Sequence, residues 1–282
     1  MIGKVCVVTG ASRGIGRAAA EGLAAMGATV VLVCRRRQDG DQVVSGMAAE
    51  SAAGALVVEA DLSSQRSIRS AATEIAQRHP RLDVLVNNAG VVPQRRQESV
   101  DGLEMQFAVN HLAYFLLTDL LLEPLRAGAP SRVVSVSSGA HFGGTLNFDD
   151  LQSERSYSPG RVYSMTKLAN ILFTRELARR VQQSGITANC LHPGVVATKL
   201  LADYMNVPLV GGAIARTFGA RPERGAETII YLASSLEVNG ITGKYFKNRR
   251  QARPSAEASD DSMARRLWEV SERLTSLTRT KP

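Results

Sequence analysis

Short runs rich in β-branched residues alternate with longer helical patterns along most of this chain, and this alternation restricts the folds open to it. The runs that read as strands are Val5–Thr9, Thr29–Cys34, Ala55–Glu59, Val84–Asn87, Arg132–Ser137 and Ile186–Leu191, with a shorter one near Lys244–Phe246. The helical patterns lie near Ile15–Met26, Ser64–Arg78, Asp101–Leu122, Arg161–Gln183 and Pro222–Leu232. Strands that are apolar throughout and separated by helices indicate a parallel sheet covered on both faces. The sequence therefore predicts an α/β fold with a doubly wound parallel sheet of about seven strands and helices on both faces.

The end of the chain differs from the rest. Residues 249–260 are polar and typical of a loop, and a last helix is expected at about Asp261–Leu277. Leu267, Leu274 and the single tryptophan, Trp268, are expected to dock this helix. Because 282 residues is an ordinary length for one α/β domain, we predict a single domain over residues 1–248 and a basic C-terminal appendage with one helix over residues 249–282.

The formal net charge of +8 comes largely from the C-terminal part of the chain, where residues 241–282 hold ten Lys and Arg against five Asp and Glu. No recognition-helix or RNA-binding motif accompanies these charges. We therefore predict a solvated basic face and no nucleic-acid partner, with an anionic membrane surface as the weaker alternative.

No targeting segment is visible before the first strand. Asp119 and Glu123 interrupt the most apolar helical stretch, His111–Leu125, so this stretch cannot span a bilayer. The cysteines lie inside apolar runs and are odd in number, which favours buried reduced thiols: Cys6, Cys34 and Cys190. We expect a cytoplasmic protein without an integral membrane segment.

A glycine-rich turn follows the first strand and opens the first helix. It reads Thr9-Gly10-Ala11-Ser12-Arg13-Gly14-Ile15-Gly16, a spacing one residue wider at its first step than the usual dinucleotide fingerprint. Gly10 permits the tight turn, Gly14 lets the backbone approach a pyrophosphate, and Gly16 allows close helix–strand packing. The helix N-terminus offers free N–H groups and a positive dipole end to phosphates. The context predicts a Rossmann-type dinucleotide site made of Gly10, Ser12, Arg13, Gly14, Ile15 and Gly16.

The residues after the second strand bear on the choice of cofactor. A cofactor without a 2′-phosphate is usually bound here by an acidic residue that hydrogen-bonds the ribose hydroxyl. The sequence instead places Arg35, Arg36 and Arg37 there, with no acid before Asp39. Guanidinium groups bind phosphate dianions bidentately. We therefore predict NADP(H), bound by Arg35 and Arg36 together with Arg13 of the glycine turn, and expect Arg37 to be a surface residue.

Tyr163 and Lys167 stand four residues apart on a helical pattern. Residues at i and i+4 share a helix face, so both side chains can enter one cleft. A free tyrosine has a pKa of about 10, too high for ready proton exchange near neutrality. A nearby cation favours phenolate, so Lys167, helped by an oxidised nicotinamide, is expected to lower the pKa of Tyr163. On its own this spacing is a weak motif.

Together with the glycine turn, these residues resemble the short-chain dehydrogenase/reductase family, and the resemblance covers about Lys4 to Phe246. The further motifs that carry it are Asp61-Leu62, Asn87-Asn88-Ala89-Gly90, Asn110, Ser137-Ser138 and Pro193-Gly194-Val195-Val196-Ala197-Thr198. Within the family the chain is similar to the retinol dehydrogenase-like branch. The segments that carry this similarity are Asn110-His111-Leu112, Ser137-Ser138-Gly139-Ala140-His141, the run from Lys167 to Phe173, and Arg265-Arg266-Leu267-Trp268.

The resemblance implies an NADP-dependent oxidoreductase that transfers a hydride between nicotinamide and a carbonyl or carbinol carbon. Tyr163 would give or take the proton, Ser138 would hold the substrate oxygen, and Asn110 would hold a water of the proton relay. Lys167 would lower the tyrosine pKa and bind the nicotinamide ribose. The remaining cofactor contacts that it implies are Asp61 and Leu62 at the adenine, Asn88, Ala89 and Gly90 along the cofactor, and Pro193, Gly194, Val196 and Thr198 over the nicotinamide.

Two stretches could build a substrate pocket. The first separates Ser138 from Tyr163 and contains His141, Phe142, Phe148 and Tyr157. The second contains Leu200, Leu201, Tyr204, Met205 and residues 207–214, and reads as a mobile lid that admits lipophilic ketones, aldehydes or alcohols, or as a cover of the core. Many animal members of the branch carry an N-terminal membrane anchor that this sequence does not show, so retinoid is not carried over as the natural substrate.

Other interpretations stay open. A related epimerase or dehydratase would show a different glycine spacing and a longer C-terminal substrate region, and a non-catalytic NADP-binding regulatory protein would commonly lack the tyrosine or lysine. His111 and His192 are expected to be structural, whereas His141 could line the substrate cleft. No His, Cys, Asp and Glu cluster indicates a metal. The resemblance also allows a homodimer through the helices at 101–122 and 161–183.

Overall fold

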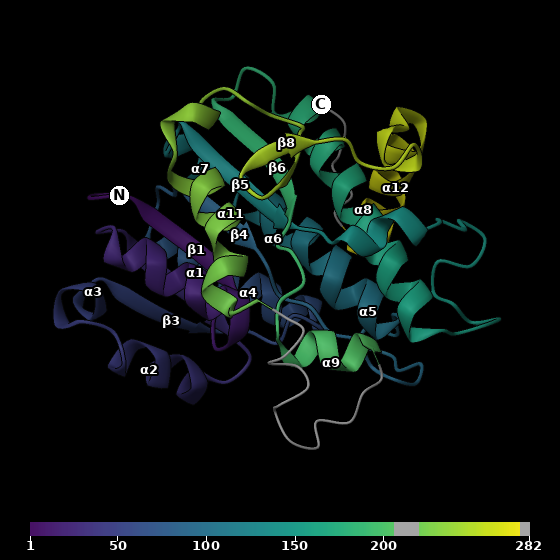
Figure 1. Ribbon diagram of the computed structural model, residues 1–282, viewed down its shortest axis with the longest axis horizontal. Coiled ribbons are helices and arrows are strands. Elements are labelled where there is room, and N and C mark those ends of the chain that lie inside the picture. Colours follow the sequence, from purple (N-terminus) through teal and green to yellow (C-terminus); the bar gives the residue numbers. More distant parts are fainter. Residues whose placement is uncertain (206–219, 277–282) are drawn as a thin grey trace.

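A twisted sheet forms the centre of the computed structural model, which describes residues 1–205 and 220–276 (Figure 1). Its strands are β1 (Val5–Thr9), β2 (Thr29–Cys34), β3 (Ala55–Glu59), β4 (Val84–Asn87), β5 (Ser131–Val136), β6 (Ile186–His192), β7 (Tyr245–Lys247) and β8 (Arg250–Ala252). Their order is β3-β2-β1-β4-β5-β6-β7-β8, and every neighbouring pair is parallel except β7 with β8. Successive strands are added on one side of β1 as far as β3 and on its other side from β4 onward. This switch in strand order leaves a crevice for a ligand at the carboxyl ends of β1 and β4.

Helices cover both faces of the sheet (Figure 1). They are α1 (Gly14–Ala25), α2 (Arg37–Ser45), α3 (Ala49–Ala53), α4 (Gln65–Arg78), α5 (Met105–Phe107), α6 (Ala113–Leu120), α7 (Leu122–Ala127), α8 (Pro159–Arg180), α9 (Lys199–Met205), α11 (Pro222–Ser234) and α12 (Asp261–Leu274). Cys6 and Val7, neighbours in β1, illustrate the two-sided burial. Cys6 belongs to the core under α1 and α11, and Val7 to the core under α4, α6 and α8.

The predicted α/β fold is confirmed, and the first four strands have the predicted bounds. β8 is a correction, because its residues were expected to form a loop. Asn248 and Arg249 both have positive φ, at 52° and 61°, and so form a two-residue hairpin turn of the kind that matches strand twist. This turn allows a polar, exposed segment to pair with β7.

The helix expected at Asp101–Leu122 begins only at Met105. Its N-cap is Glu104, whose carboxylate accepts hydrogen bonds from two backbone N–H groups of the first turn. Asp101, the first residue of the expected range, instead accepts a hydrogen bond from the backbone of Gln65, 2.8 Å away, at the start of α4. A carboxylate in a loop can serve whichever helix start lies nearby, which spacing alone does not reveal.

Two helices were missed after β2. The interior of α2 contains Gly40, a residue that lowers helix propensity. A Cβ on Gly40 would lie 2.5 Å from Cγ1 of Val57 in β3, so close packing against the sheet requires glycine here.

The predicted Arg161–Gln183 helix is α8, which begins earlier, with Pro159 in its first turn, and ends at Arg180.

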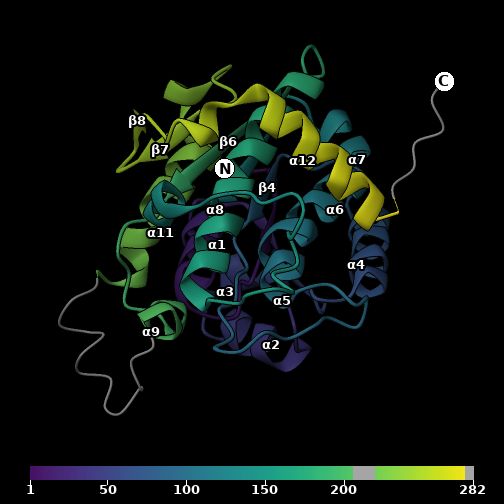
Figure 2. The ribbon, with the colours of Figure 1, turned by 90° about the vertical axis from the view of Figure 1, so that its right-hand side faces the viewer.

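The C-terminal helix α12 crosses the outside of α8, as Figure 2 shows. The side chains expected to dock it do so: Leu267 and Trp268 are buried, and Leu274 packs against the same core. Trp268 lies against Phe115 and Phe173, with ring centroids 4.8 and 5.9 Å apart. The predicted end at Leu277 lies outside the described residues. Among helices in the described ranges, none is long and apolar enough to cross a membrane.

Candidate active site

The glycine turn is locked to the end of β4. Thr9 Oγ1 accepts hydrogen bonds from the backbone of Asn88 and Ala89 at 2.9 and 3.1 Å, and Asn88 Nδ2 donates to the Thr9 carbonyl at 2.9 Å. A Cβ on Gly16 would collide with Asn88 Nδ2, and one on Gly10 would lie 2.9 Å from Cα of Ala89. The turn therefore needs glycine at both positions, and the predicted residues at the ends of β1 and β4 lie together.

The N-terminus of α1 faces this crevice without a side-chain cap. Gly14, in the first turn, has a φ of 56°, and its nearest side-chain neighbour is Thr198. Four backbone N–H groups at a helix start have no partner inside the helix. An uncapped, glycine-lined helix start is the geometry that binds phosphate.

The arginines beside the crevice differ in their pairing. Arg36 forms a bidentate ion pair with Asp39, at 2.7 and 3.0 Å. Arg13 and Arg35 are exposed and have no ion pair within residues 1–205 and 220–276. Arg37 is exposed too, and only its backbone N–H is engaged, by Glu59. Arg13 and Arg35 are thus available to an anion, whereas Arg36 is shared with Asp39.

Asp61 and Leu62 follow β3, as predicted. The Asp61 carboxylate accepts hydrogen bonds from the backbone and hydroxyl of Ser63, at 3.0 and 2.7 Å. These bonds hold the carboxylate at the exposed carboxyl edge of the sheet, while Leu62 packs against the core.

Tyr163 and Lys167 lie on the buried face of α8, with exposed fractions of only 6% and 2%. Lys167 Nζ lies 5.4 Å from the centre of the Tyr163 ring and 5.8 Å from the centre of the Tyr114 ring. It donates to the Val136 carbonyl, 3.1 Å away, at the end of β5. The ammonium group and the phenol therefore share one pocket, as the spacing predicts.

The electrostatics of this pair differ from the prediction. Burial raises the pKa of Tyr163 above its ordinary value, hydrogen bonding with Ser138 acts in the opposite direction, and the nearby Tyr204 adds to the rise. Burial also lowers the pKa of Lys167 to about 7. In the protein alone Lys167 does not lower the tyrosine pKa, because the same burial that brings the two together weakens the charge on the lysine. The lowering expected with an oxidised nicotinamide bound stays a prediction.

Ser138 follows β5 and forms the N-cap of a short 3-10 turn, η2 (Gly139–Gly143). Its Oγ accepts a hydrogen bond from the Ala140 backbone at 3.2 Å and also interacts with the Tyr163 phenol. The serine hydroxyl and the tyrosine hydroxyl thus lie next to each other, where one oxygen of a bound molecule could touch both.

Asn110 lies in a π-helical turn, η1 (Ala108–Leu112), and is fully buried. Its amide accepts a hydrogen bond from the Val91 backbone N–H at 2.8 Å and donates to the Val91 carbonyl at 3.0 Å and to Thr166 at 3.3 Å. The side chain therefore ties the loop after β4 to α8. π-turns of this kind are frequent at functional sites.

The segment after β6 closes one side of the crevice. Thr198 lies over the glycine turn, and its Oγ1 accepts a hydrogen bond from Leu201 at the start of α9. On α9, the Tyr204 ring lies 5.1 Å from the Tyr163 ring, centroid to centroid. Gln94 donates to the Asp203 carbonyl at 2.5 Å. The predicted Pro193, Gly194 and Val196 belong to this segment; of the predicted lid, residues 207–214 lie outside the described ranges.

The four residues that could line a pocket before Tyr163 are mostly engaged in packing. His141 is fully buried, so the expectation that it could line the cleft was wrong. Tyr157 donates to the Pro93 carbonyl at 2.6 Å, and Phe148 stacks beneath Arg266. Only Phe142, with 61% of its surface exposed, is free to meet a ligand.

The other two histidines near the site are structural, as expected. His111 is buried and pairs with Ser271 of α12 at 3.0 Å. His192 Nδ1 accepts a hydrogen bond from the Gly139 backbone at 3.0 Å. Within the described part of the chain no cluster of His, Cys, Asp and Glu could hold a metal ion, and the cysteines are free and buried.

Sequence reasoning missed Tyr114 and Asn170, which complete the lysine pocket. Tyr114 donates to the Ala89 carbonyl at 2.8 Å, and Asn170 Nδ2 donates to the Val136 carbonyl at 3.3 Å. The available signal was helical spacing, since Tyr114 follows Asn110 by four residues and Asn170 follows Lys167 by three.

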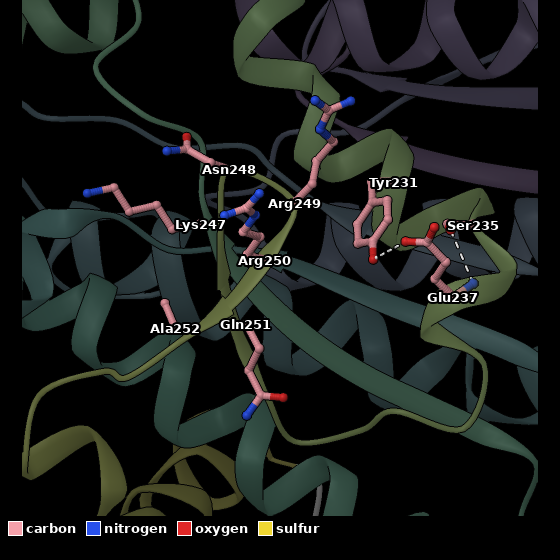
Figure 3. A pocket seen from close by; sticks show the side chains of 9 residues that line it. All are labelled: Tyr231, Ser235, Glu237, Lys247, Asn248, Arg249, Arg250, Gln251 and Ala252. Atoms are coloured by element: carbon pink, nitrogen blue, oxygen red, sulfur yellow. Dashed lines mark hydrogen bonds between the residues drawn. The ribbon is translucent and has the colours of Figure 1, made fainter.

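An open hollow lies elsewhere, between the β7–β8 hairpin and the end of α11 (Figure 3). It is lined by Tyr231, Ser235, Glu237, Lys247, Asn248, Arg249, Arg250, Gln251 and Ala252. The labelled side chains come from exposed or half-buried positions, and the Tyr231 hydroxyl is hydrogen-bonded to Glu237 at 2.9 Å. None of the predicted site residues lines this hollow.

Comparisons with known proteins agree with this geometry. The sequence model of the family described as short chain dehydrogenase matches residues 4–206. The chain is 45% identical to human retinol dehydrogenase 14, over 98% of this chain and 88% of that protein. It is 42% identical to human retinol dehydrogenase 13, over 98% and 85% of the two chains.

Solved structures are similar as well. An uncharacterized protein from Mycobacterium paratuberculosis has a TM-score of 0.80 and 35% identity, over 98% of this chain and 94% of its own. A short chain dehydrogenase from Burkholderia cenocepacia, in complex with NADP, has a TM-score of 0.69 and 28% identity, over 87% of this chain and 96% of its own.

Proposed function

Because the chain belongs to the short chain dehydrogenase family, in its retinol dehydrogenase-like branch, and is therefore an oxidoreductase, we propose that it transfers a hydride between NADP(H) and a lipophilic ketone, aldehyde or alcohol. Tyr163 is the proton donor and acceptor. The observation that carries this proposal is the convergence of Tyr163, Lys167 and Ser138 in one pocket at the end of β5.

The crevice fits a dinucleotide. Gly10 and Gly16 leave no room for a Cβ, and the start of α1 is uncapped, so backbone N–H groups can contact a pyrophosphate. The cofactor, when bound, supplies the hydride. The proposed binding residues are Gly10, Ser12, Arg13, Gly14, Ile15, Gly16, Arg35, Arg36, Asp61, Leu62, Asn88, Ala89, Gly90, Tyr163, Lys167, Pro193, Gly194, Val196 and Thr198.

The preference for NADP(H) is attributed to Arg13 and Arg35. Both guanidinium groups are free of ion pairs among the described residues, and no acidic side chain follows β2 directly. Arg36 contributes less, since Asp39 occupies its guanidinium. Solved relatives with bound NADP, at 28% identity, support this choice.

The proton chemistry falls to four residues. Ser138 holds the substrate oxygen, and the Tyr163 phenol, beside it, gives that oxygen a proton or takes one. The raised pKa of Tyr163 keeps the phenol protonated, which suits carbonyl reduction. Lys167 holds the nicotinamide ribose and the tyrosine in place. Asn110 positions the loop after β4 through the hydrogen bonds of its amide, and would hold a water of the proton relay.

A lipophilic substrate is supported by the lining of the crevice and by the relatives. Leu200 and Tyr204 of α9 face Gly90 and Tyr163. The similar human proteins are retinol dehydrogenases by name, so a retinoid-like molecule is one substrate of this class. We further propose a cytoplasmic location and a catalytic domain over residues 1–248, with residues 249–282 as an appendage. A homodimer through α6 and α8 is not part of the proposal, because α12 packs on α8 and its Trp268 packs on Phe115 of α6.

The experiment is a panel of lipophilic aldehydes, ketones and alcohols, retinal and retinol included, with NADPH oxidation or NADP reduction followed at about 340 nm. Turnover of at least one member, with NADPH preferred to NADH, is the expected result. A protein that binds NADPH but reduces or oxidises no member of the panel would contradict the proposal.

A further inference from the structure

One buried histidine joins Ser138 to the C-terminal segment. His141 Nδ1 lies 2.6 Å from the Ser138 carbonyl oxygen, and the His141 backbone N–H donates to the same oxygen at 3.2 Å. On the other side of the ring, the Ser255 backbone N–H donates to Nε2 at 3.1 Å. The imidazole therefore bridges two segments that are 117 residues apart in sequence, from Ser138 to Ser255.

These partners fix the state of the ring. A carbonyl oxygen only accepts hydrogen bonds, so Nδ1 of His141 carries the proton. A backbone N–H only donates, so Nε2 carries the lone pair. Only the neutral ring with the proton on Nδ1 makes both bonds. Burial favours that neutral form, because it lowers the pKa of His141 below its ordinary value.

The peptide unit that follows Ser138 is held at both ends. His141 binds its carbonyl group, and His192 Nδ1 accepts from its N–H group, that of Gly139, at 3.0 Å. Rotation of this peptide plane would break both bonds. The plane sets the direction of Ser138, whose hydroxyl lies beside the Tyr163 phenol.

No water can replace the ring without a change in packing. His141 has an exposed fraction of 0% and lies between Phe142 and Tyr245, with ring centroids 4.1 and 5.0 Å away. Loss of the second bond would leave the N–H of the buried Ser255 without its imidazole partner. Loss of the first would leave the Ser138 carbonyl with only the longer bond from the His141 backbone N–H, so the peptide after Ser138 would be held less firmly.

We propose that His141 is a positioning residue for the reaction: its Nδ1 side fixes the peptide after Ser138, and its Nε2 side anchors the C-terminal segment at Ser255. The catalytic effect of His141 rests on the proposed function of Ser138. The bridge from Ser138 to Ser255 does not, because it follows from the two contacts of the imidazole.

The two bonds of His141 can be separated by substitution. In His141→Asn, the side-chain amide can donate from near the Nδ1 position to the Ser138 carbonyl but does not reach Ser255. In His141→Gln, the amide oxygen can accept from Ser255 near the Nε2 position but offers no donor near Nδ1. The same substitutions at His79, which follows α4 and has no such bridge, serve as matched controls.

With the best substrate of the panel, His141→Gln is expected to lower kcat by about 10- to 100-fold, the effect of a small misplacement of a catalytic group. The KM for NADPH should stay within about twofold. His141→Asn should keep most of kcat while loosening the C-terminal segment, and the His79 variants should match the wild type. Equal losses of kcat in His141→Asn and His141→Gln, or no loss in either variant, would overturn the proposal.

Backbone hydrogen exchange gives a readout that does not depend on turnover. Exchange at residues 139–143 is expected to rise in His141→Gln and to stay near wild type in His141→Asn, whereas exchange at residues 255–259 should show the reverse. If the wild type turns over nothing, the proposed function fails while these exchange patterns still decide the bridge. Equal exchange patterns in the two variants would refute it.

Discussion

Replacing Lys167 with methionine is predicted to stabilise the folded protein while it abolishes turnover. The lysine is buried, and burial lowers its pKa from 10.5 to about 7. In the unfolded chain the pKa returns to its ordinary value. Since one pKa unit corresponds to about 1.4 kcal/mol, keeping this lysine folded costs about 4 kcal/mol at pH 7. Methionine has a similar length and carries no charge.

The variant loses one hydrogen bond, from Lys167 to the Val136 carbonyl, worth about 1 kcal/mol. The carbonyl keeps its bond from Asn170, so it is not left without a partner. The free energy of unfolding of Lys167→Met at pH 7 should therefore exceed that of the wild type by about 2 to 3 kcal/mol.

The stability difference between Lys167→Met and the wild type should depend on pH, and the lowered pKa of Lys167 gives the direction. Between pH 7 and 10.5 the unfolded chain binds the lysine proton and the folded protein does not, so wild-type stability rises with pH in this window relative to the variant. The destabilisation is fully present below pH 7 and is lost as the pH approaches 10.5. The advantage of the variant should thus fall by about 3 kcal/mol between pH 7 and pH 10.

Urea unfolding without cofactor, followed by the fluorescence of the single tryptophan, Trp268, measures both free energies. Lys247→Met, at an exposed position, is the control and should change stability by less than about 0.5 kcal/mol. A Lys167→Met protein that is less stable than the wild type at pH 7, or whose advantage grows with pH, would refute the reasoning.

Further predictions concern the cofactor site and the C-terminal helix. Arg35→Ala should raise the KM for NADPH by about 10- to 100-fold and that for NADH little, whereas Arg37→Ala should change either by less than about threefold in steady-state assays. Gly16→Ala should weaken NADPH binding at least about tenfold in a fluorescence titration, because its Cβ would collide with Asn88 and with the Gly10 carbonyl. Trp268→Ala should lower the free energy of unfolding by about 3 to 5 kcal/mol, because it removes a buried aromatic ring. The control Leu236→Ala, at an exposed position, should lower it by less than about 0.5 kcal/mol. Thermal or urea denaturation followed by circular dichroism measures both.

The strands could be predicted because their sequences are apolar throughout. A segment such as Val84–Asn87 is buried throughout, as a strand of a sheet covered on both faces must be. The structure gives this strand the predicted bounds. By contrast, α2 contains Gly40, whose presence follows from contact with Val57 of another strand. Local propensity cannot reveal a residue that is chosen by a tertiary contact.

The residues of the candidate site were predicted by motif, but their environment was not. The spacing of Tyr163 and Lys167 places both in one pocket, yet it says nothing about how much water remains there. Burial decides the pKa of both groups and opposes the predicted direction for Tyr163. The contact between His141 and Ser255 is equally invisible in the sequence, since it joins distant segments.

The proposed proton transfer depends on the phenol of Tyr163, and Tyr163→Phe tests it most directly. This change removes one oxygen from a buried ring and leaves the glycine turn and the arginines in place. The measurement is kcat for the best substrate together with the dissociation constant of NADPH, with Tyr231→Phe, an exposed phenol bonded to Glu237, as the matched control. We predict that kcat falls by a factor of at least about 100 while NADPH binding stays within about threefold, and that the control is unchanged. A Tyr163→Phe protein that keeps near-normal turnover would contradict the role proposed for this phenol.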